Sequence, residues 1–239
     1  MKKLILLPVA ALLAVGAMAQ KTIHDANAEV RSVGSFHAVK VSGGIDLYLS
    51  SGDEAVAVSA KDVEYRDRIK TQVENGVLKI YYEWKDMRGV VWGNNKALKA
   101  YVSYKVLDLI GASGGSDVII DGTVKASNLA ISLSGGSDFK GKVDAQTLRI
   151  DASGGSDVDI AGAAGNLKVD VSGGSDFNGY DLVAETCNAD ASGGSDVYIT
   201  VNKELKADAS GGSDVLYRGN AATVNSSKSG GSSVKKTGK

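Results

Sequence analysis

The chain of 239 residues contains one cysteine, one proline and two histidines. The lone Cys187 cannot form a disulfide within the chain, and the sequence lacks the Cys/His cluster that structural zinc needs. Collagen and proline-rich disordered chains require proline, so a chain whose only proline is Pro8 belongs to neither class. His24 and His37 leave little scope for histidine-based catalysis. Aromatic side chains make up only 6% of the sequence, so Val, Ile, Leu and Ala must build the core.

The segment 1–19 is typical of a secretory signal peptide. Two lysines precede an apolar run over 4–15, and Ala17-Met18-Ala19 places small residues where signal peptidase cleaves, before Gln20. The apolar run is shorter than the ~18 residues that a bilayer-spanning helix needs. We therefore expect an exported protein, whether periplasmic, outer-membrane-associated or extracellular, with no transmembrane segment in the mature chain.

Charge is unevenly distributed along the chain. Residues 108–217 carry seven basic and 17 acidic side chains, whereas residues 218–239 carry five basic side chains and no acidic ones. Nucleic-acid binding requires a positive surface toward the phosphates, so the acidic middle argues against a nucleic-acid partner. Cations or basic partner surfaces remain compatible with this charge.

Glycine, by contrast, is abundant, with 30 residues, and much of it lies in a repeated pentad. The pentad Ser-Gly-Gly-Ser-Asp recurs at nearly constant intervals, and a degenerate copy starts at Ser229. Its six copies begin at Ser113, Ser134, Ser153, Ser172, Ser192 and Ser210. Regular repetition of this kind decides the architecture of a chain, so it takes precedence over local signals.

The residues around each pentad alternate between apolar and polar, as in Leu148, Ile150 and Ala152 before the third copy. Period two indicates strands with one buried face. A unit of about 20 residues, built as strand, Gly-Gly turn and strand, matches one coil of a parallel β-helix, with equivalent residues stacked ~4.8 Å apart. Propeller blades need about 40 residues, so antiparallel hairpin architectures fit less well. Cys187 then falls in an inward column with Leu148 and Leu167, as a small buried hydrophobe.

We divide the chain into the signal peptide 1–19, an N-terminal β region over 20–107, the repeats over 108–233 and a basic tail over 234–239. The N-terminal region is less regular but also β. Residues 69–82 predict a hairpin around Asn75-Gly76, and Asp62 to Arg68 suit a short helical turn. We expect this region to be continuous with the β-helix and to cap one open end, because a bare end exposes unpaired backbone groups.

The order of these pieces resembles the putative auto-transporter adhesin "head GIN domain" family of exported bacterial proteins. The matching segments are Phe36 to Asp46, Ile69 to Tyr82, Val102 to Leu109 and the run of Gly-Gly-Ser-Asp coils. The resemblance implies a right-handed β-helix, an envelope or surface location and a binding role. A true auto-transporter also carries a membrane-embedded barrel of several hundred residues, for which this chain has no room.

Stacked coils would align the aspartates of the pentads into one outward column and a second set of aspartates into another. Like charges ~4.8 Å apart repel by about 1 kcal/mol in water, so hydrogen bonds from turn amides or bound Ca²⁺ must offset the repulsion. The pentad only partly echoes the calcium-binding Gly-Gly-x-Gly-x-Asp repeat of β-rolls. The candidate metal ligands are Asp117, Asp138, Asp157, Asp176, Asp196 and Asp214, and the second column is Asp151, Asp170, Asp190 and Asp208.

The sequence therefore predicts an all-β, right-handed parallel β-helix with an outer face of Ser, Asp and Gly. We predict a non-enzymatic, adhesin-like envelope module that binds an unknown protein or glycan and can self-associate, without an obligatory cofactor. Trp92 and Trp84 are candidate partner contacts, because aromatic rings supply contact area at low entropic cost. A β-helical polysaccharide-active enzyme and a calcium-binding structural envelope protein are the alternatives.

Overall fold

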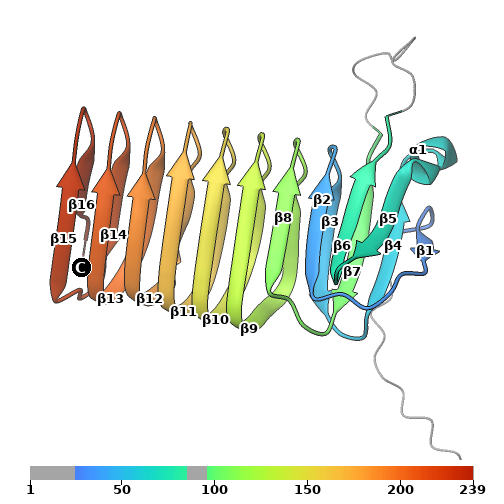
Figure 1. Cartoon of the computed structure of the whole chain (residues 1–239), viewed down its shortest axis with the longest axis horizontal. Coiled ribbons are helices and arrows are strands. Elements are labelled where there is room, and N and C mark those ends of the chain that lie inside the picture. The colour runs from blue at the N-terminus through green and yellow to red at the C-terminus, as the bar shows by residue number, and fades with distance from the viewer. Residues whose placement is uncertain (1–24, 85–95, 239) are drawn as a thin grey trace, which may run out of the picture.

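The structure, a computed structural model, describes residues 25–84 and 96–238. The predicted signal peptide and Trp92 lie outside the described residues. The described part is almost wholly β, with sixteen strands joined in one continuous sheet. Figure 1 shows that this sheet is wound into flattened coils stacked along one axis, with the Gly-Gly turns along one edge.

Five long strands form most of the repeat region. Each contributes its first half to one coil and its second half to the next. Each starts after a Gly-Gly turn on what we call the post-turn face, bends at the opposite edge, and ends on the pre-turn face at the next Gly-Gly turn (Figure 1). The long strands are β9 (Val118–Ser134), β10 (Phe139–Ser153), β11 (Val158–Ser172), β12 (Phe177–Ala191) and β13 (Asp196–Ala209). The last coils are formed by β14 (Asp214–Arg218), β15 (Thr223–Lys228) and β16 (Ser233–Lys236).

The long strands pair in parallel, with equivalent residues of successive repeats in register. Leu148 pairs with Leu167, and Leu167 pairs with Cys187, as the spacing of the pentads predicts. In Figure 1 the pre-turn strands run upward in front while the chain advances away from the N-terminal cap, so the winding is right-handed. The predicted right-handed parallel β-helix is confirmed.

The described chain before β9 contributes shorter strands and the only helix of the described part. These elements are β1 (Glu29–Arg31), β2 (Ala38–Ser42), β3 (Asp46–Ser51), β4 (Ala55–Ser59), α1 (Val63–Asp67), β5 (Ile69–Glu74), β6 (Val77–Tyr82), β7 (Lys99–Tyr104) and β8 (Leu109–Ser113). Strands β5 and β6 form the predicted antiparallel hairpin, with Asn75 and Gly76 both at positive φ in its turn. The short helix likewise falls where the sequence predicts a helical turn.

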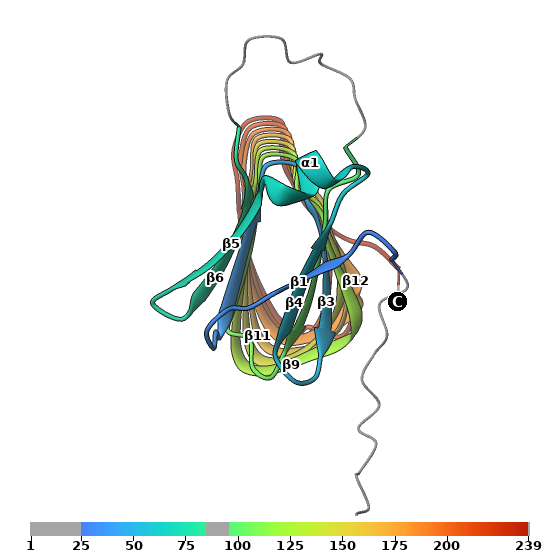
Figure 2. The same cartoon turned by 90° about the vertical axis from the view of Figure 1, so that its right-hand side faces the viewer.

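The spatial order of the N-terminal coils differs from their order in the chain. Strand β2 pairs with both β6 and β8, and β3 pairs with both β7 and β9. The coil of β2 and β3 therefore lies between the later coil of β6 and β7 and the first repeat coil. At the outer end the pairing is antiparallel, between β1 and β4, β4 and β7, and β5 and β6, and Figure 2 shows β1 crossing the mouth of the solenoid.

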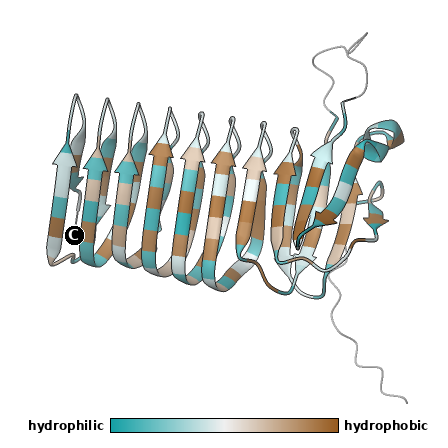
Figure 3. Ribbon diagram, in the orientation of Figure 1, coloured by the Kyte–Doolittle hydropathy of each residue, from teal (hydrophilic) through white to brown (hydrophobic). Residues whose placement is uncertain are grey.

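The core is a set of inward columns running the length of the solenoid. Figure 3 shows the resulting apolar bands, which alternate with polar ones along each strand. Leu148 and Leu205 are fully buried, and Cys187 is 4% exposed in the same column. Burial raises the pKa of the Cys187 thiol to about 12, so this residue is a packed, protonated side chain.

The second serine of each pentad corrects the prediction that Ser, Asp and Gly together form the outer face. These serines point inward and have no exposed surface: Ser116, Ser137, Ser156, Ser175, Ser195 and Ser213. The Oγ of Ser175 accepts a hydrogen bond from the backbone N–H of Ser156 at 3.0 Å. The hydroxyls of five of these serines accept backbone N–H groups near the turns, and the Ser195 hydroxyl donates to the carbonyl of Ser192, so the serines satisfy buried backbone groups that lack strand partners.

Candidate functional site

The predicted aspartate column exists and forms a hydrogen-bonded ladder along the turn edge. Each carboxylate except the last accepts a hydrogen bond from the backbone N–H of the next aspartate in the column, at 3.1 to 3.3 Å, and the last, Asp214, accepts one from the Ser233 hydroxyl at 2.6 Å. The column consists of Asp117, Asp138, Asp157, Asp176, Asp196 and Asp214. Among the described residues, no three His, Cys, Asp or Glu side chains converge as a metal site. Cation binding by this column remains a prediction.

Asp46 of β3 extends the column toward the N-terminal cap, beside Asp117. Burial is the main factor that raises the pKa of Asp46, the Asp117 charge adds to it, and Lys99 on β7 acts in the opposite direction. The ionised form of Asp46 is therefore less favourable in the folded chain than in the unfolded one.

The second aspartate column lies in register on the pre-turn face, as predicted. It aligns Asp151, Asp170, Asp190 and Asp208. Here cations of the same chain neutralise acids: Arg149 Nε donates to Asp151 at 2.7 Å, and Lys206 lies 3.5 Å from Asp208. Part of the charge on this face is thus neutralised by ion pairs within the protein.

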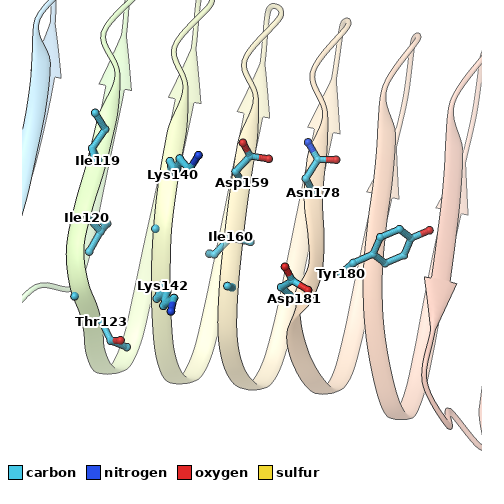
Figure 4. A pocket seen from close by; sticks show the side chains of 13 residues that line it. Ile119, Ile120, Thr123, Lys140, Lys142, Asp159, Ile160, Asn178, Tyr180 and Asp181 are labelled. Carbon is cyan, nitrogen blue, oxygen red and sulfur yellow. The ribbon is translucent and has the colours of Figure 1, made fainter. Parts of the chain in front are cut away.

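The post-turn face holds a groove of about 660 Å³ that crosses the coils of β9 to β12. Figure 4 shows Ile119, Lys140, Asp159 and Asn178 in one row, one residue from each coil. Lys142, Thr123 and Asp181 lie nearer the opposite edge of the coils (Figure 4). The groove thus offers apolar, cationic, anionic and amide groups on neighbouring coils.

Small residues on β9, β10 and β11 make the groove possible. The groove is lined by three small residues, which do not project from the surface: Gly122, Gly141 and Ala161. A Cβ atom on Gly141 would lie 2.4 Å from the side chain of Ile120, so the packing there excludes any side chain. The buried side chains of Ile120 and Phe139 therefore require glycine at position 141.

The polar side chains of the groove are not engaged with one another. In the described part of the chain, no hydrogen bond or ion pair is made by the side chains of Thr123, Lys140, Lys142, Asp159, Asn178 and Asp181. On the pre-turn face, by contrast, Arg149 is committed to Asp151. The groove therefore presents free donors and acceptors of both charges in one place.

One tyrosine lies at the C-terminal end of the groove and another lies just beyond its N-terminal end. At the C-terminal end, Tyr180 carries the guanidinium of Arg218 3.8 Å from its ring centre, and its hydroxyl hydrogen-bonds with Thr237 at 2.8 Å. Beyond the N-terminal end, Tyr48 pairs in register with Ile119 and stacks on Tyr101 with ring centres 5.2 Å apart. These contacts hold the rings at defined positions.

Sequence reasoning did not identify the groove, although a signal for it exists. The outward position two residues after each pentad aspartate holds a different residue type in every coil, while the neighbouring columns repeat. Its occupants are Ile119, Lys140, Asp159, Asn178, Tyr198 and Leu216. A variable column within a constant repeat indicates that the column is not needed for coil stacking.

Of the two tryptophans predicted as partner contacts, Trp84 is described and Trp92 is not. Trp84 is 54% exposed and follows β6. Its ring centre lies 4.5 Å from the Lys96 ammonium, within a second depression of about 490 Å³ that also includes Asp46. Partner contact through Trp84 remains a prediction.

Comparisons with known proteins agree with this architecture. The family model described as "Putative auto-transporter adhesin, head GIN domain" matches residues 35–221. A "putative adhesin" from Bacteroides fragilis NCTC 9343 has a TM-score of 0.79 at 19% identity, with 88% of this chain and 96% of that chain covered. One from Parabacteroides merdae ATCC 43184 has a TM-score of 0.69 at 17% identity, with coverages of 88% and 95%.

A third solved structure is described as a "putative lipid binding protein" from Parabacteroides distasonis ATCC 8503. Its TM-score is 0.64 at 20% identity, with 90% of this chain and 98% of that chain covered. No curated relative matches the chain. At these identities the structural likeness establishes the fold alone. Within the described residues, the one helix, α1, has five residues and falls far short of a bilayer's thickness.

Proposed function

Because the chain belongs to the auto-transporter adhesin head GIN domain family, we propose that it is an exported, non-enzymatic binding module of the cell envelope that holds its ligand in the post-turn groove. A rigid solenoid is suited to this role, since its face presents side chains at fixed spacing without further ordering on binding.

The observation that carries this proposal is the set of unengaged polar groups in the groove. Lys140 and Asp159 occupy paired positions on adjacent strands, yet the described chain contains no ion pair between them. A pre-formed concave surface in which apolar side chains surround a few convergent polar groups is typical of ligand sites. On the pre-turn face, by comparison, Arg149 is paired with Asp151 and Lys206 with Asp208, so fewer charges there are available to a ligand.

The binding test uses one substitution to fill the groove and a matched one elsewhere. Ala161→Trp places a bulky ring in the groove, and Ala130→Trp places the same ring on the pre-turn face. We expect the exported wild-type protein to sediment with isolated cell envelopes. Ala161→Trp should reduce the bound fraction at least fivefold, while Ala130→Trp should bind like wild type. Equal binding by all three proteins would overturn the assignment of the groove.

Export and surface display form the second part of the proposal. They are supported by the signal-like segment 1–19 and by the adhesin-like family. Expression of the full chain with a C-terminal epitope, followed by fractionation and antibody labelling of intact cells, tests both. We expect a mature protein that begins at Gln20 and is labelled without permeabilisation. An unprocessed cytoplasmic product would contradict export.

A polysaccharide-active enzyme is the competing class, and Asp159 and Asp181 in the groove are the acids it would use. Incubation with neutral and acidic polysaccharides separates the two functions. The binding proposal predicts no new reducing ends and no unsaturated products, whereas turnover that disappears in Asp159→Asn or Asp181→Asn would establish an enzyme.

A further inference from the structure

We propose that the ligand of the post-turn groove is a linear, uncharged glycan that lies along the solenoid axis, across the coils of β9 to β12. This inference rests on the proposed binding function and specifies the class of ligand. It follows from the spacing, the hydrogen-bonding groups and the net charge of the groove, and from the exposure of its apolar side chains.

The spacing favours an extended polymer. Ile119 pairs with Lys140, Lys140 with Asp159, and Asp159 with Asn178, so four consecutive coils present one outward residue each in a single row (Figure 4). Parallel coils repeat every ~4.8 Å, which is close to the length of one sugar unit in an extended chain. A linear glycan laid across the coils would therefore meet one side chain per sugar.

The hydrogen-bonding groups suit hydroxyls. Lys140 and Lys142 donate, Asp159 and Asp181 accept, and the Asn178 amide and the Thr123 hydroxyl do both. Sugar hydroxyls donate and accept, so they can satisfy this mixed set without a fixed charge. Two lysines and two aspartates line the groove, so its formal charge is zero and favours an uncharged ligand over an acidic or basic one.

A peptide strand fits this surface poorly. The groove lies on the face of a sheet whose strands already pair on both sides, since β10 pairs with β9 and with β11. An extended peptide would find no free strand edge for its backbone N–H and C=O groups, which peptide recognition by added strands requires.

An acyl chain fits poorly as well. Of the three isoleucines that line the groove, Ile120 is 8% exposed and Ile160 is 3% exposed, so Ile119 is the most exposed of the three. Tyr180, held by Arg218 and Thr237, adds a fixed ring at one end. An isolated aliphatic patch and a rigid ring can pack against the C–H faces of sugars, but they do not enclose a lipid tail.

The test titrates the exported full chain with oligosaccharides of defined charge and length by isothermal calorimetry. The probes are neutral linear hexasaccharides of glucose, mannose and N-acetylglucosamine, together with their monosaccharides, hexagalacturonate and hexalysine. We expect a neutral hexasaccharide to bind at least tenfold more tightly than its monosaccharide and more tightly than either charged probe.

Matched substitutions assign the binding to the groove. Asn178→Ala and Asp181→Asn should weaken binding of that hexasaccharide at least fivefold. Asn128→Ala on the pre-turn face and Asp144→Asn outside the groove lining should leave it unchanged, and thermal melts of all four variants check folding. Equal losses in the groove and control variants would overturn the assignment.

The outcomes separate the two proposals. Envelope binding that is lost in Ala161→Trp, with no neutral hexasaccharide bound, would overturn the glycan inference and leave the binding function standing. Tighter binding of hexagalacturonate or hexalysine would overturn the uncharged class. Absence of both envelope and oligosaccharide binding would overturn both proposals.

Discussion

The carboxylate of Asp157 accepts a hydrogen bond from the backbone N–H of Asp176, 3.3 Å away in the next coil. Asp157 in turn donates its own N–H to the carboxylate of Asp138. Neighbouring carboxylates at the coil spacing repel each other by about 1 kcal/mol in water. The amide hydrogen bonds offset that repulsion, so the column is compatible with stacking even in the absence of a cation.

Asp157→Ala should lower the melting temperature by about 2–4 °C, because it removes a hydrogen bond worth about 1 kcal/mol. Asp157→Asn keeps an acceptor oxygen and removes a charge from the column, so it should melt at or slightly above the wild-type temperature. Differential scanning calorimetry measures both. If the alanine variant melts no lower than the asparagine variant, the ladder does not stabilise the fold.

Ser175→Ala should destabilise the protein by about 1–3 kcal/mol, because the buried N–H of Ser156 loses its acceptor. Ser172→Ala in the same pentad is the control, since Ser172 is partly exposed and should change stability by less than about 0.5 kcal/mol. Urea denaturation followed by circular dichroism distinguishes them. Equal effects would indicate that burial of the serine column has no energetic role.

Gly154→Ala should cost about 1–2 kcal/mol, because Gly154 has a φ of +72° that disfavours any Cβ. The added Cβ would also lie 3.2 Å from the backbone nitrogen of Gly135. Gly174→Ala is the matched control, since Gly174 is outside the positive-φ set and has open space around its Cβ position. Chemical denaturation should show Gly174→Ala within about 1 kcal/mol of wild type or more stable; a larger loss at Gly174 would contradict the turn geometry.

Asp46→Asn should stabilise the protein at neutral pH, because the raised pKa of Asp46 means that the folded state disfavours its charge. Below the ordinary Asp pKa of 3.8, this carboxyl is protonated in both the folded and the unfolded protein, and its contribution to the stability of the fold is then complete. That contribution is lost as the pH rises through the raised pKa of the folded state. Melts at pH 7 and near pH 3 check the sign: the variant should gain only at pH 7. A gain of the same size at both pH values would exclude a titration effect.

Thermal melts in millimolar Ca²⁺ and in chelator test the predicted cation site of the aspartate column. One oxygen of each bonded carboxylate already accepts an amide, and the described residues show no converging third ligand, so we expect the two curves to superimpose. Bridging by Ca²⁺ would instead raise the melting temperature by several degrees, and neutralising Asp157 and Asp176 to asparagine should then abolish the shift.

The repeat made most of the solenoid predictable. Leu148, Leu167 and Cys187 recur at one offset from their pentads, and that offset alone fixes the register of the long strands. The inward direction of Ser175 could not be predicted in this way, because alternation across a two-glycine turn depends on backbone torsions. The position of the β2–β3 coil between two later coils could not be predicted either, since the order of strands in the sequence does not tell which coil a capping strand joins.

The groove could not be predicted from the sequence for a different reason. Its members are chemically unlike one another, so a search for recurring residues passes over Lys140, Asp159 and Asn178. Their proximity depends on the register, and their availability depends on the absence of partners among the described side chains, which only coordinates show.

The interleaved coil has a mechanical consequence. The coil of β2 and β3 is enclosed by β6 and β7 on one side and by β8 and β9 on the other, and the segment from Lys105 to Asp108 passes from one enclosing coil to the next. A pulling force on the N-terminal side therefore cannot detach this coil by itself. It must first separate the cap strands β6 and β7 from it. A molecule anchored at that end would resist shear by this interlock.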